Sequence, residues 1–144
     1  MKILLAYDGS SFAEAAVTLL IKGQKGNEAE VRVVDVVEGA FAGTPPQMAP
    51  GYAPELEEVK KRAKEFVDGA VTRLRLAGYR AEGVVVQGEV RKAILGMAEE
   101  WNADLILLGS HGYGHVKRFL LGSVAEYVAR HAECSVEIVR AKAA

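Results

Sequence analysis

The sequence predicts a doubly wound α/β fold, in which helices cover both faces of a five-stranded parallel sheet. Short apolar runs alternate with amphipathic segments along the whole chain, beginning and ending with a strand. Each connection is long enough to hold a helix, and crossovers of that length make the strands parallel and the connections right-handed. One run, Leu105–Leu108, is apolar throughout, which is typical of a strand buried on both faces.

Length and composition indicate a single domain over residues 1–144, with half of its residues apolar. Because the chain has 18 basic and 19 acidic residues, it carries no overall positive charge that would hold nucleic acid or a membrane surface. The sequence has no apolar run of about 18 residues, so we expect no transmembrane helix. Asp8 follows the first apolar run too early for a signal peptide, and we therefore expect a cytoplasmic protein.

The first strand and helix are marked by their ends. Ile3–Tyr7 is a short apolar run that is closed by the turn residues Asp8-Gly9. Ser11 and Glu14, three residues apart, have the spacing of a capping box, so a helix is expected to start at Ser11. Gly23 ends the apolar periodicity of this helix.

A second strand and a long loop follow. The β-branched run over residues 31–37 predicts the strand. Residues 38–54 contain all four prolines of the chain, which predicts a long surface loop. Loops of this length are uncommon unless they are functional or disordered, and this one is either a variable insertion or a lid over a ligand.

The third quarter of the chain contains the clearest helix. Pro54 is suited to its first position, and apolar residues then recur at steps of three and four until Gly78. Val84–Val86 forms a third strand. A third helix over residues 90–101 carries one apolar stripe, and Asn102 can close it.

The last quarter begins with the buried strand Leu105–Leu108, before which Asp104 is expected to be a structural cap. A fourth helix carries its apolar residues from Val124 to His131, and we expect His131 to be packed on its inner face. The last strand, residues 136–139, alternates with polar residues and is expected to be less buried than the others.

A glycine-rich loop joins the buried strand to the fourth helix. Glycines stand at 109, 112 and 114, and the loop ends at Gly122-Ser123. Such a loop before a helix N-terminus offers bare N–H groups and the positive end of a helix dipole, which suits a phosphate. The basic residues His115, Lys117 and Arg118 either neutralise such an anion or are solvated loop charges. Neither the P-loop spacing nor the dinucleotide fingerprint is present.

Sheets of this class bind ligands beyond the carboxyl ends of their strands, at a switch point in the strand order. Asp8 ends the first strand, and the glycine loop follows Leu108 at the end of the fourth. We therefore expect Asp8 and the glycine loop to face one crevice. Asp8 either accepts hydrogen bonds from a ligand or caps its own turn.

The spacing G-x2-G-x9-G-S, made by Gly109, Gly112, Gly122 and Ser123, resembles the nucleotide-binding motif of the universal stress protein family. Ile3–Ser10 looks like the first strand and aspartate turn of that family, and Asp104–Gly112 looks like its most typical segment. The resemblance, to the ATP-binding branch, implies the strand order 3-2-1-4-5. It also implies ATP or a related adenine nucleotide such as AMP as ligand, and a homodimer formed through residues 135–140. Mg²⁺ is a further candidate cofactor, which the hydrolase alternative below requires.

The resemblance also implies a set of ligand contacts. Asp8 would meet the adenosine end, and the backbone of Val36 would meet the adenine. Gly109 and Gly112 would lie along the ribose and first phosphates. The N–H groups of residues 122–125 would hold the outer phosphates, with Ser123 both capping the helix and adding its hydroxyl. The full set of expected binding residues is Ala6, Tyr7, Asp8, Val36, Leu108, Gly109, Gly112, Gly114, His115, Gly122, Ser123, Val124 and Ala125.

Two residues depart from the family pattern. Ala125 stands where many nucleotide-binding members have Ser or Thr, so one hydroxyl contact is lost. Tyr7 is bulkier than the residue usual beside the aspartate, which could narrow the adenosine pocket.

The sequence favours holding a nucleotide over cleaving it. Phosphoryl transfer needs a positioned base and strong metal ligands, and no Asp or Glu lies between Leu105 and Val124. We therefore expect a regulatory nucleotide-binding protein of the stress response with no catalytic residues, and His111 as a loop-structuring residue. The alternatives are a slow Mg²⁺-dependent ATP hydrolase assisted by Asp8 or His111, and a nucleotide-free dimeric interaction module. A receiver-type signalling domain is disfavoured because Gln87 replaces the phospho-acceptor aspartate.

Overall fold

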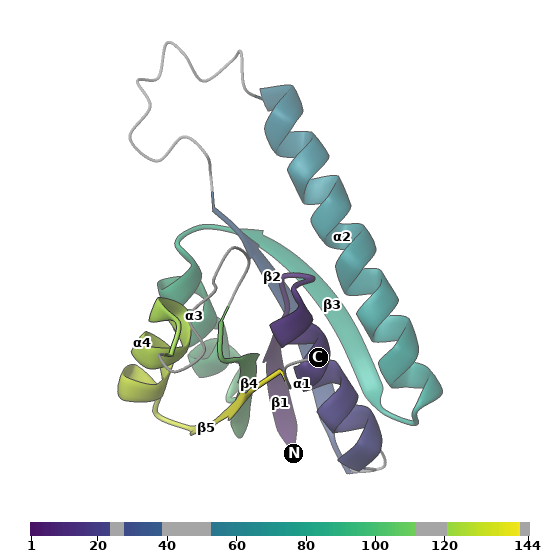
Figure 1. The fold of residues 1–144 in the computed structure, drawn as a ribbon, viewed down its shortest axis with the longest axis vertical. Coiled ribbons are helices and arrows are strands. Elements are labelled where there is room, and N and C mark those ends of the chain that lie inside the picture. The colour runs from purple at the N-terminus through teal and green to yellow at the C-terminus, as the bar shows by residue number, and fades with distance from the viewer. Residues whose placement is uncertain (24–27, 39–52, 112–120, 142–144) are drawn as a thin grey trace.

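The structure of this 144-residue protein is a computed structural model, which describes residues 1–23, 28–38, 53–111 and 121–141. Strands and helices alternate through these ranges (Figure 1). In chain order they are β1 (Lys2–Ala6), α1 (Ser11–Gly23), β2 (Glu30–Val37), α2 (Ala53–Leu76), β3 (Arg80–Gln87), α3 (Val90–Trp101), β4 (Leu105–Gly109), α4 (Ser123–His131) and β5 (Ser135–Val139).

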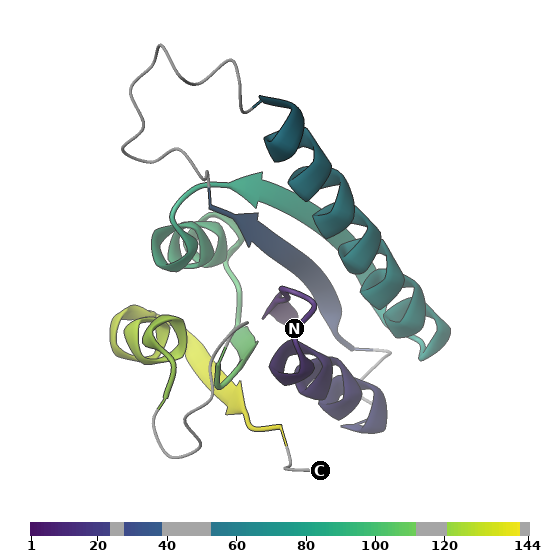
Figure 2. The same ribbon diagram turned by 45° about the horizontal axis from the view of Figure 1, so that its top comes forward.

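The sheet has the predicted topology. Its strand order is β3-β2-β1-β4-β5, and every neighbouring pair is parallel. Helices α1 and α2 cover one face, while α3 and α4 cover the other (Figure 2). The doubly wound fold and the strand order 3-2-1-4-5 are therefore confirmed.

Two hydrophobic clusters, one on each face, hold the layers together. Successive side chains of a strand point to opposite faces, so Leu5 joins the cluster under α1 and α2 while Leu4 joins the one under α3 and α4. Both side chains are fully buried, as is Ile106 of β4. The apolar runs of the central strands thus reflect burial on both faces.

Two helix ends differ from the sequence prediction. Helix α1 is capped by Ser10, whose hydroxyl oxygen accepts a hydrogen bond from the Ala13 N–H at 3.2 Å. The capping box predicted for Ser11 and Glu14 is therefore wrong. The expectation of a packed His131 is also wrong, because this side chain is exposed and stacks on Tyr127.

Other ends are as expected. Asn102 ends α3 in the left-handed conformation with φ 56°, and Gly78 follows α2 with φ 99°. Asp104 accepts a hydrogen bond from the Lys2 N–H at 2.7 Å, which ties the start of β4 to the start of β1. Most of the loop predicted for residues 38–54 lies outside the described residues.

The single tryptophan lies at the amino ends of the strands. The Trp101 side chain is buried at the end of α3. The Arg32 guanidinium lies 4.5 Å from its ring centre, and the Lys2 ammonium lies 5.4 Å from it. These cation–π contacts join β1, β2 and α3 at the end of the sheet opposite to the strands' carboxyl ends.

Candidate functional site

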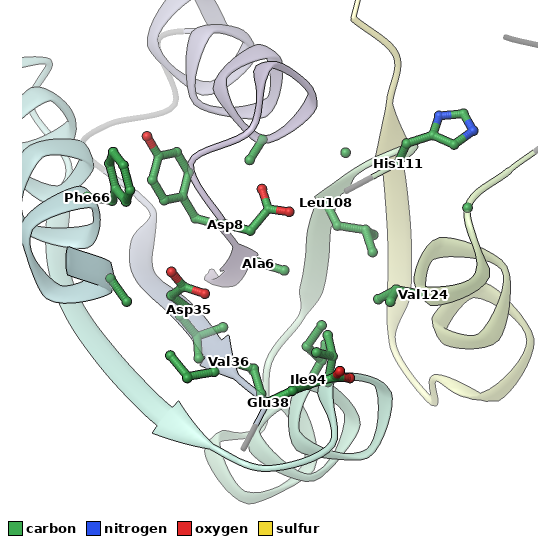
Figure 3. Close-up of a pocket in the computed structure, with 18 of the residues that line it drawn as sticks. Ala6, Asp8, Asp35, Val36, Glu38, Phe66, Ile94, Leu108, His111 and Val124 are labelled. Atoms are coloured by element: carbon green, nitrogen blue, oxygen red, sulfur yellow. The ribbon is translucent and has the colours of Figure 1, made fainter. Parts of the chain in front are cut away.

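A cavity of about 610 Å³ opens at the carboxyl ends of β1, β2 and β4, beside the N-terminus of α4 (Figure 3). Ten of the predicted binding residues line it: Ala6, Tyr7, Asp8, Val36, Leu108, Gly109, Gly122, Ser123, Val124 and Ala125. The other three, Gly112, Gly114 and His115, lie outside the described residues, as do Lys117 and Arg118. The fold thus brings the end of β1 and the end of β4 to one cavity, as the sequence predicted.

Asp8 makes a turn contact and also faces the cavity. Its Oδ1 accepts a hydrogen bond from the Ser10 N–H at 2.9 Å, next to Gly9, whose φ is 79°. This contact holds the carboxylate in place after β1. The remaining acceptor positions of the carboxylate face the cavity, where a ligand hydroxyl or amine could donate to them.

Val36 presents its backbone to the same space. The ladder between β1 and β2 stops at Ala6 and Val34, and the Tyr7 N–H donates to the Val34 carbonyl at 2.8 Å. Alternate residues of a strand direct their N–H and C=O groups to the same side, so those of Val36 also point toward β1. Because β1 has ended there, they point to the cavity as one donor and one acceptor.

The two glycines at the β4 side of the cavity have packing reasons of their own. A Cβ on Gly109 would come within 2.7 Å of the Phe12 carbonyl carbon in α1. A Cβ on Gly122 would come within 2.9 Å of the Ser110 carbonyl oxygen. The Gly122 N–H donates to that same oxygen at 2.8 Å, and this bond fixes where α4 begins.

Helix α4 directs its first turn at the cavity. Its N-cap is Gly122, with φ −64° and ψ 156°, so the expectation that Ser123 caps the helix is wrong. The N–H groups of residues 123–125 lie in the first turn, where the helix itself supplies no carbonyl acceptor for them. They carry the positive end of the helix dipole, which favours an anion. Ala125 is 2% exposed, so its methyl group packs against the sheet.

The wall formed by α2 was not predicted as part of the site. Val59, Arg62, Ala63 and Phe66 line the cavity from this helix. Val59 and Phe66 belong to the apolar periodicity that predicts this helix, and their side chains are 49% and 41% exposed. The apolar stripe of α2 therefore serves two surfaces, the core through Val67 and Leu74 and the cavity nearer its N-terminus.

Tyr7 links the cavity to α1 and α2. Its hydroxyl donates to the Glu14 carboxylate, and Arg73 of α2 holds that carboxylate with two hydrogen bonds of 2.7 and 3.0 Å. Burial and the bond to Glu14 raise the pKa of Tyr7 well above its usual value. The phenol is therefore neutral and held toward α2, and its ring forms part of the cavity wall.

Asp35 is a second carboxyl group in the cavity, and the sequence analysis missed it. It lies within the β-branched run of β2, which indicated only a strand. Burial, together with the nearby charge of Asp8, raises its pKa to about 6. An acidic residue flanked by two valines on each side was the signal that could have found it.

Among the described residues, no group of three or more His, Cys, Asp or Glu side chains is arranged to hold a metal ion. Within the same residues, no helix has the length and apolarity needed to cross a bilayer.

The fold and the site define a doubly wound α/β protein with a ligand cavity at the switch point of its sheet. A family model, that of the universal stress protein family, matches residues 1–140. Universal stress protein YxiE of Bacillus subtilis (strain 168) is 32% identical to this chain and is matched over 96% of this chain and 98% of its own length. The chain belongs to the universal stress protein family.

Solved structures are similar over nearly the whole chain. Universal stress protein UspA from Lactobacillus plantarum is 25% identical, with a TM-score of 0.84 and 97% of each chain covered. The universal stress protein from Archaeoglobus fulgidus, solved in complex with dAMP, is 25% identical, with a TM-score of 0.71 over 96% of this chain and 97% of that one. A universal stress protein solved in complex with cAMP is 25% identical, with a TM-score of 0.63 over 99% and 98%.

Proposed function

We propose that this protein binds ATP or a related adenine nucleotide in the cavity and acts in the cytoplasm as a nucleotide-dependent regulator in the stress response. The observation that carries the proposal is the convergence of three groups on one cavity: the Asp8 carboxylate, the outward backbone of Val36 and the first turn of α4. The complexes of two relatives with dAMP and cAMP support the same ligand class.

The chemistry of the cavity predicts how the nucleotide would be oriented in it. The base and ribose carry donors and acceptors that match the Val36 backbone and the Asp8 carboxylate. The phosphates are anions that match the free N–H groups and the dipole of α4. The apolar wall from Val59 and Phe66 suits the face of a purine ring. Mg²⁺ would accompany the phosphates of ATP from solution.

Hydrolysis is not part of this proposal. The segment from Leu105 to Val124 contains no Asp or Glu that could serve as a base beside the phosphates. A regulator needs only a binding site whose occupation changes a surface that other molecules can recognise. The α2 wall is a candidate for that surface, because Val59 and Phe66 line the cavity and are also partly exposed to solvent.

The binding proposal is tested with Asp8→Ala and the matched control Asp68→Ala, which removes an exposed carboxylate of α2 paired with Lys64. Isothermal titration calorimetry with ATP, AMP and cAMP should show binding to the parent protein. Asp8→Ala should weaken it by about tenfold or more, since a hydrogen bond to a charged group is lost. Asp68→Ala should bind as the parent does.

Thermal melts of both variants separate lost binding from lost folding, because Asp8 also accepts the Ser10 N–H. If the parent binds none of the three nucleotides, or if a folded Asp8→Ala variant binds them as tightly as the parent, the proposed site is wrong. Mass spectrometry of ligand retained on purification would identify the natural nucleotide.

The proposal includes a homodimer formed through β5. This strand is at the edge of the sheet and pairs only with β4 among the described strands. An edge strand exposes unpaired backbone groups, which a second copy of the chain could satisfy. Analytical ultracentrifugation should give about twice the 15.5-kDa chain mass. A single 15.5-kDa species at all accessible concentrations would exclude this dimer.

A further inference from the structure

Asp35 lies on the α2 side of the cavity, beside Asp8. On β2, Val31 and Val33 belong to the cluster under α1 and α2, so the alternation of the strand puts Asp35 on the same face. Its partner on β3 is Val85, which offers no charge. Figure 3 shows the Asp35 side chain below those of Phe66 of α2 and Asp8 of the β1 end, and all three residues line the cavity.

The two carboxyl groups differ in what supports them. Asp8 accepts a hydrogen bond from the Ser10 N–H at 2.9 Å. No hydrogen bond or ion pair within the described part of the chain reaches the carboxyl of Asp35, which is half-buried. Burial without a hydrogen-bond donor favours the protonated form of Asp35. Burial and the charge of Asp8 together raise its pKa to about 6.

Neither Tyr7 nor Arg62, which also line the cavity, is suited to take up a proton in place of Asp35. The Tyr7 hydroxyl is held by Glu14, and the pKa of this phenol is raised away from neutrality. Arg62 of α2 lines the cavity as well, but its side chain is exposed. The described titratable and charged residues that line the cavity are Tyr7, Asp8, Asp35, Glu38, Arg62 and His111.

We propose that Asp35 couples nucleotide binding in this cavity to the uptake of one proton, so that affinity rises as the medium becomes more acidic. This inference rests on the proposed function, since it concerns the same site. A bound nucleotide removes water from the half-buried carboxyl and brings negative phosphates into the cavity. Both effects penalise the carboxylate form of Asp35 and favour the neutral acid.

The neutral acid also suits adenine. A protonated carboxyl group has one O–H donor and one carbonyl acceptor. The adenine edge offers the complementary pair, an amine hydrogen beside a ring nitrogen acceptor. A carboxylate can only accept, so it would leave that ring nitrogen without a donor. Proton uptake thus adds a donor that the charged side chain lacks.

The sign and size of the effect follow from linkage. The free protein holds the proton only below a pH of about 6, whereas the complex holds it at higher pH as well. If only the protonated form binds, affinity at pH 5.5 should exceed that at pH 7.5 by up to about 25-fold. At pH 7, binding should take up about 0.9 proton per nucleotide.

The test compares the parent with Asp35→Asn, which keeps the shape of the side chain and removes its charge. ATP is titrated by calorimetry at pH 5.5, 6.5 and 7.5. The phosphates of ATP titrate in this range too, but they affect both proteins equally, so the measured quantity is the ratio of the two dissociation constants. Asp35→Asn should bind at least tenfold more tightly than the parent at pH 7.5, and about equally at pH 5.5.

Proton uptake is measured directly by repeating the pH 7 titration in buffers of different ionisation enthalpy. The parent should take up about 0.9 proton more than Asp35→Asn. The control Asp68→Asn, on the exposed face of α2, should keep the parent's pH profile.

Two results separate this inference from the proposed function. In the first, both proteins bind ATP while the ratio of their dissociation constants either stays constant with pH or shifts in favour of the parent as the pH rises. In that case Asp35 is not the coupled group, and the nucleotide site stands. If neither protein binds ATP at any of the three pH values, the nucleotide site itself is refuted and the coupling with it.

Discussion

Glu14 joins three elements through its carboxylate, since it accepts from Tyr7 of the β1 end and from Arg73 of α2. Burial raises the pKa of Glu14, but the bonds from Arg73 and Tyr7 outweigh it, and the net pKa is below the usual value. A depressed carboxyl pKa contributes stability above the unfolded pKa, and this contribution is lost as the pH falls through the folded one.

Glu14→Gln should therefore lower the free energy of unfolding at pH 7 by about 1 kcal/mol, because the pair is partly exposed. The difference from the parent should shrink as the pH falls through the lowered pKa of the folded protein's Glu14, because the parent's side chain then becomes protonated too. Urea unfolding of both proteins at pH 7 and in acid measures this difference in the free energy of unfolding. Glu57→Gln, whose partner Lys60 is 3.9 Å away on the surface, serves as the control and should change little. A loss for Glu14→Gln that is equally large in acid would contradict the charge argument.

The same residue explains why a helix cap was predicted wrongly. Ser11 and Glu14 have the spacing of a capping box, yet Ser10 caps the helix. The Glu14 carboxylate is instead held by Arg73, which lies 59 positions along the chain from it. A local pattern cannot include such a partner, so the helix was predicted correctly and its cap was not.

At the scale of elements, glycine positions report close packing as well as ligand contact. A Cβ on Gly122 would meet the Ser110 carbonyl at 2.9 Å, whereas a Cβ on Gly96 of α3 would meet nothing within 4 Å. Gly122→Ala should therefore destabilise the fold by about 1–3 kcal/mol. Gly96→Ala should stabilise it by about 1 kcal/mol, the usual gain inside a helix.

Thermal unfolding of the two variants checks this pair of predictions. Should Gly122→Ala melt like the parent, the contact between α4 and the β4 end is looser than described. A loss of nucleotide binding in a Gly122 variant identifies a phosphate contact only if the stability of that variant has been measured first.

Strand β3 shows where element boundaries escape the sequence. Only Val84–Val86 was predicted, yet β3 pairs with β2 over eight residues from Arg80 to Gln87. Gly83 lies in the middle, and a Cβ there would come within 2.3 Å of the Val67 side chain of α2. A glycine usually weakens a strand, but here it lets a helix approach the sheet closely. That reason exists only in the folded protein.

For the whole molecule, the sequence was sufficient to predict the topology and the part of the cavity that the ends of β1 and β4 form. The ends of β1 and β4 carry their own signals in Asp8 and in the glycine spacing, and the parallel topology brings them together. The α2 wall and Asp35 depend on how a helix lies over a strand, which periodicity does not encode. The sequence therefore predicted Phe66 only as part of an apolar helix face, and it did not single out Asp35 among the valines of its strand.

The position of Trp101 has a practical consequence for solution work. This indole, the only one in the chain, lies between two cations at the far end of the sheet from the cavity. Its fluorescence, excited at a wavelength that adenine does not absorb, should shift to the red on unfolding and stay constant while ATP saturates the protein. Emission spectra recorded across a nucleotide titration check this, and a saturable change would mean that occupancy is transmitted through the sheet. We therefore expect Trp101 to report on folding without responding to the proposed nucleotide.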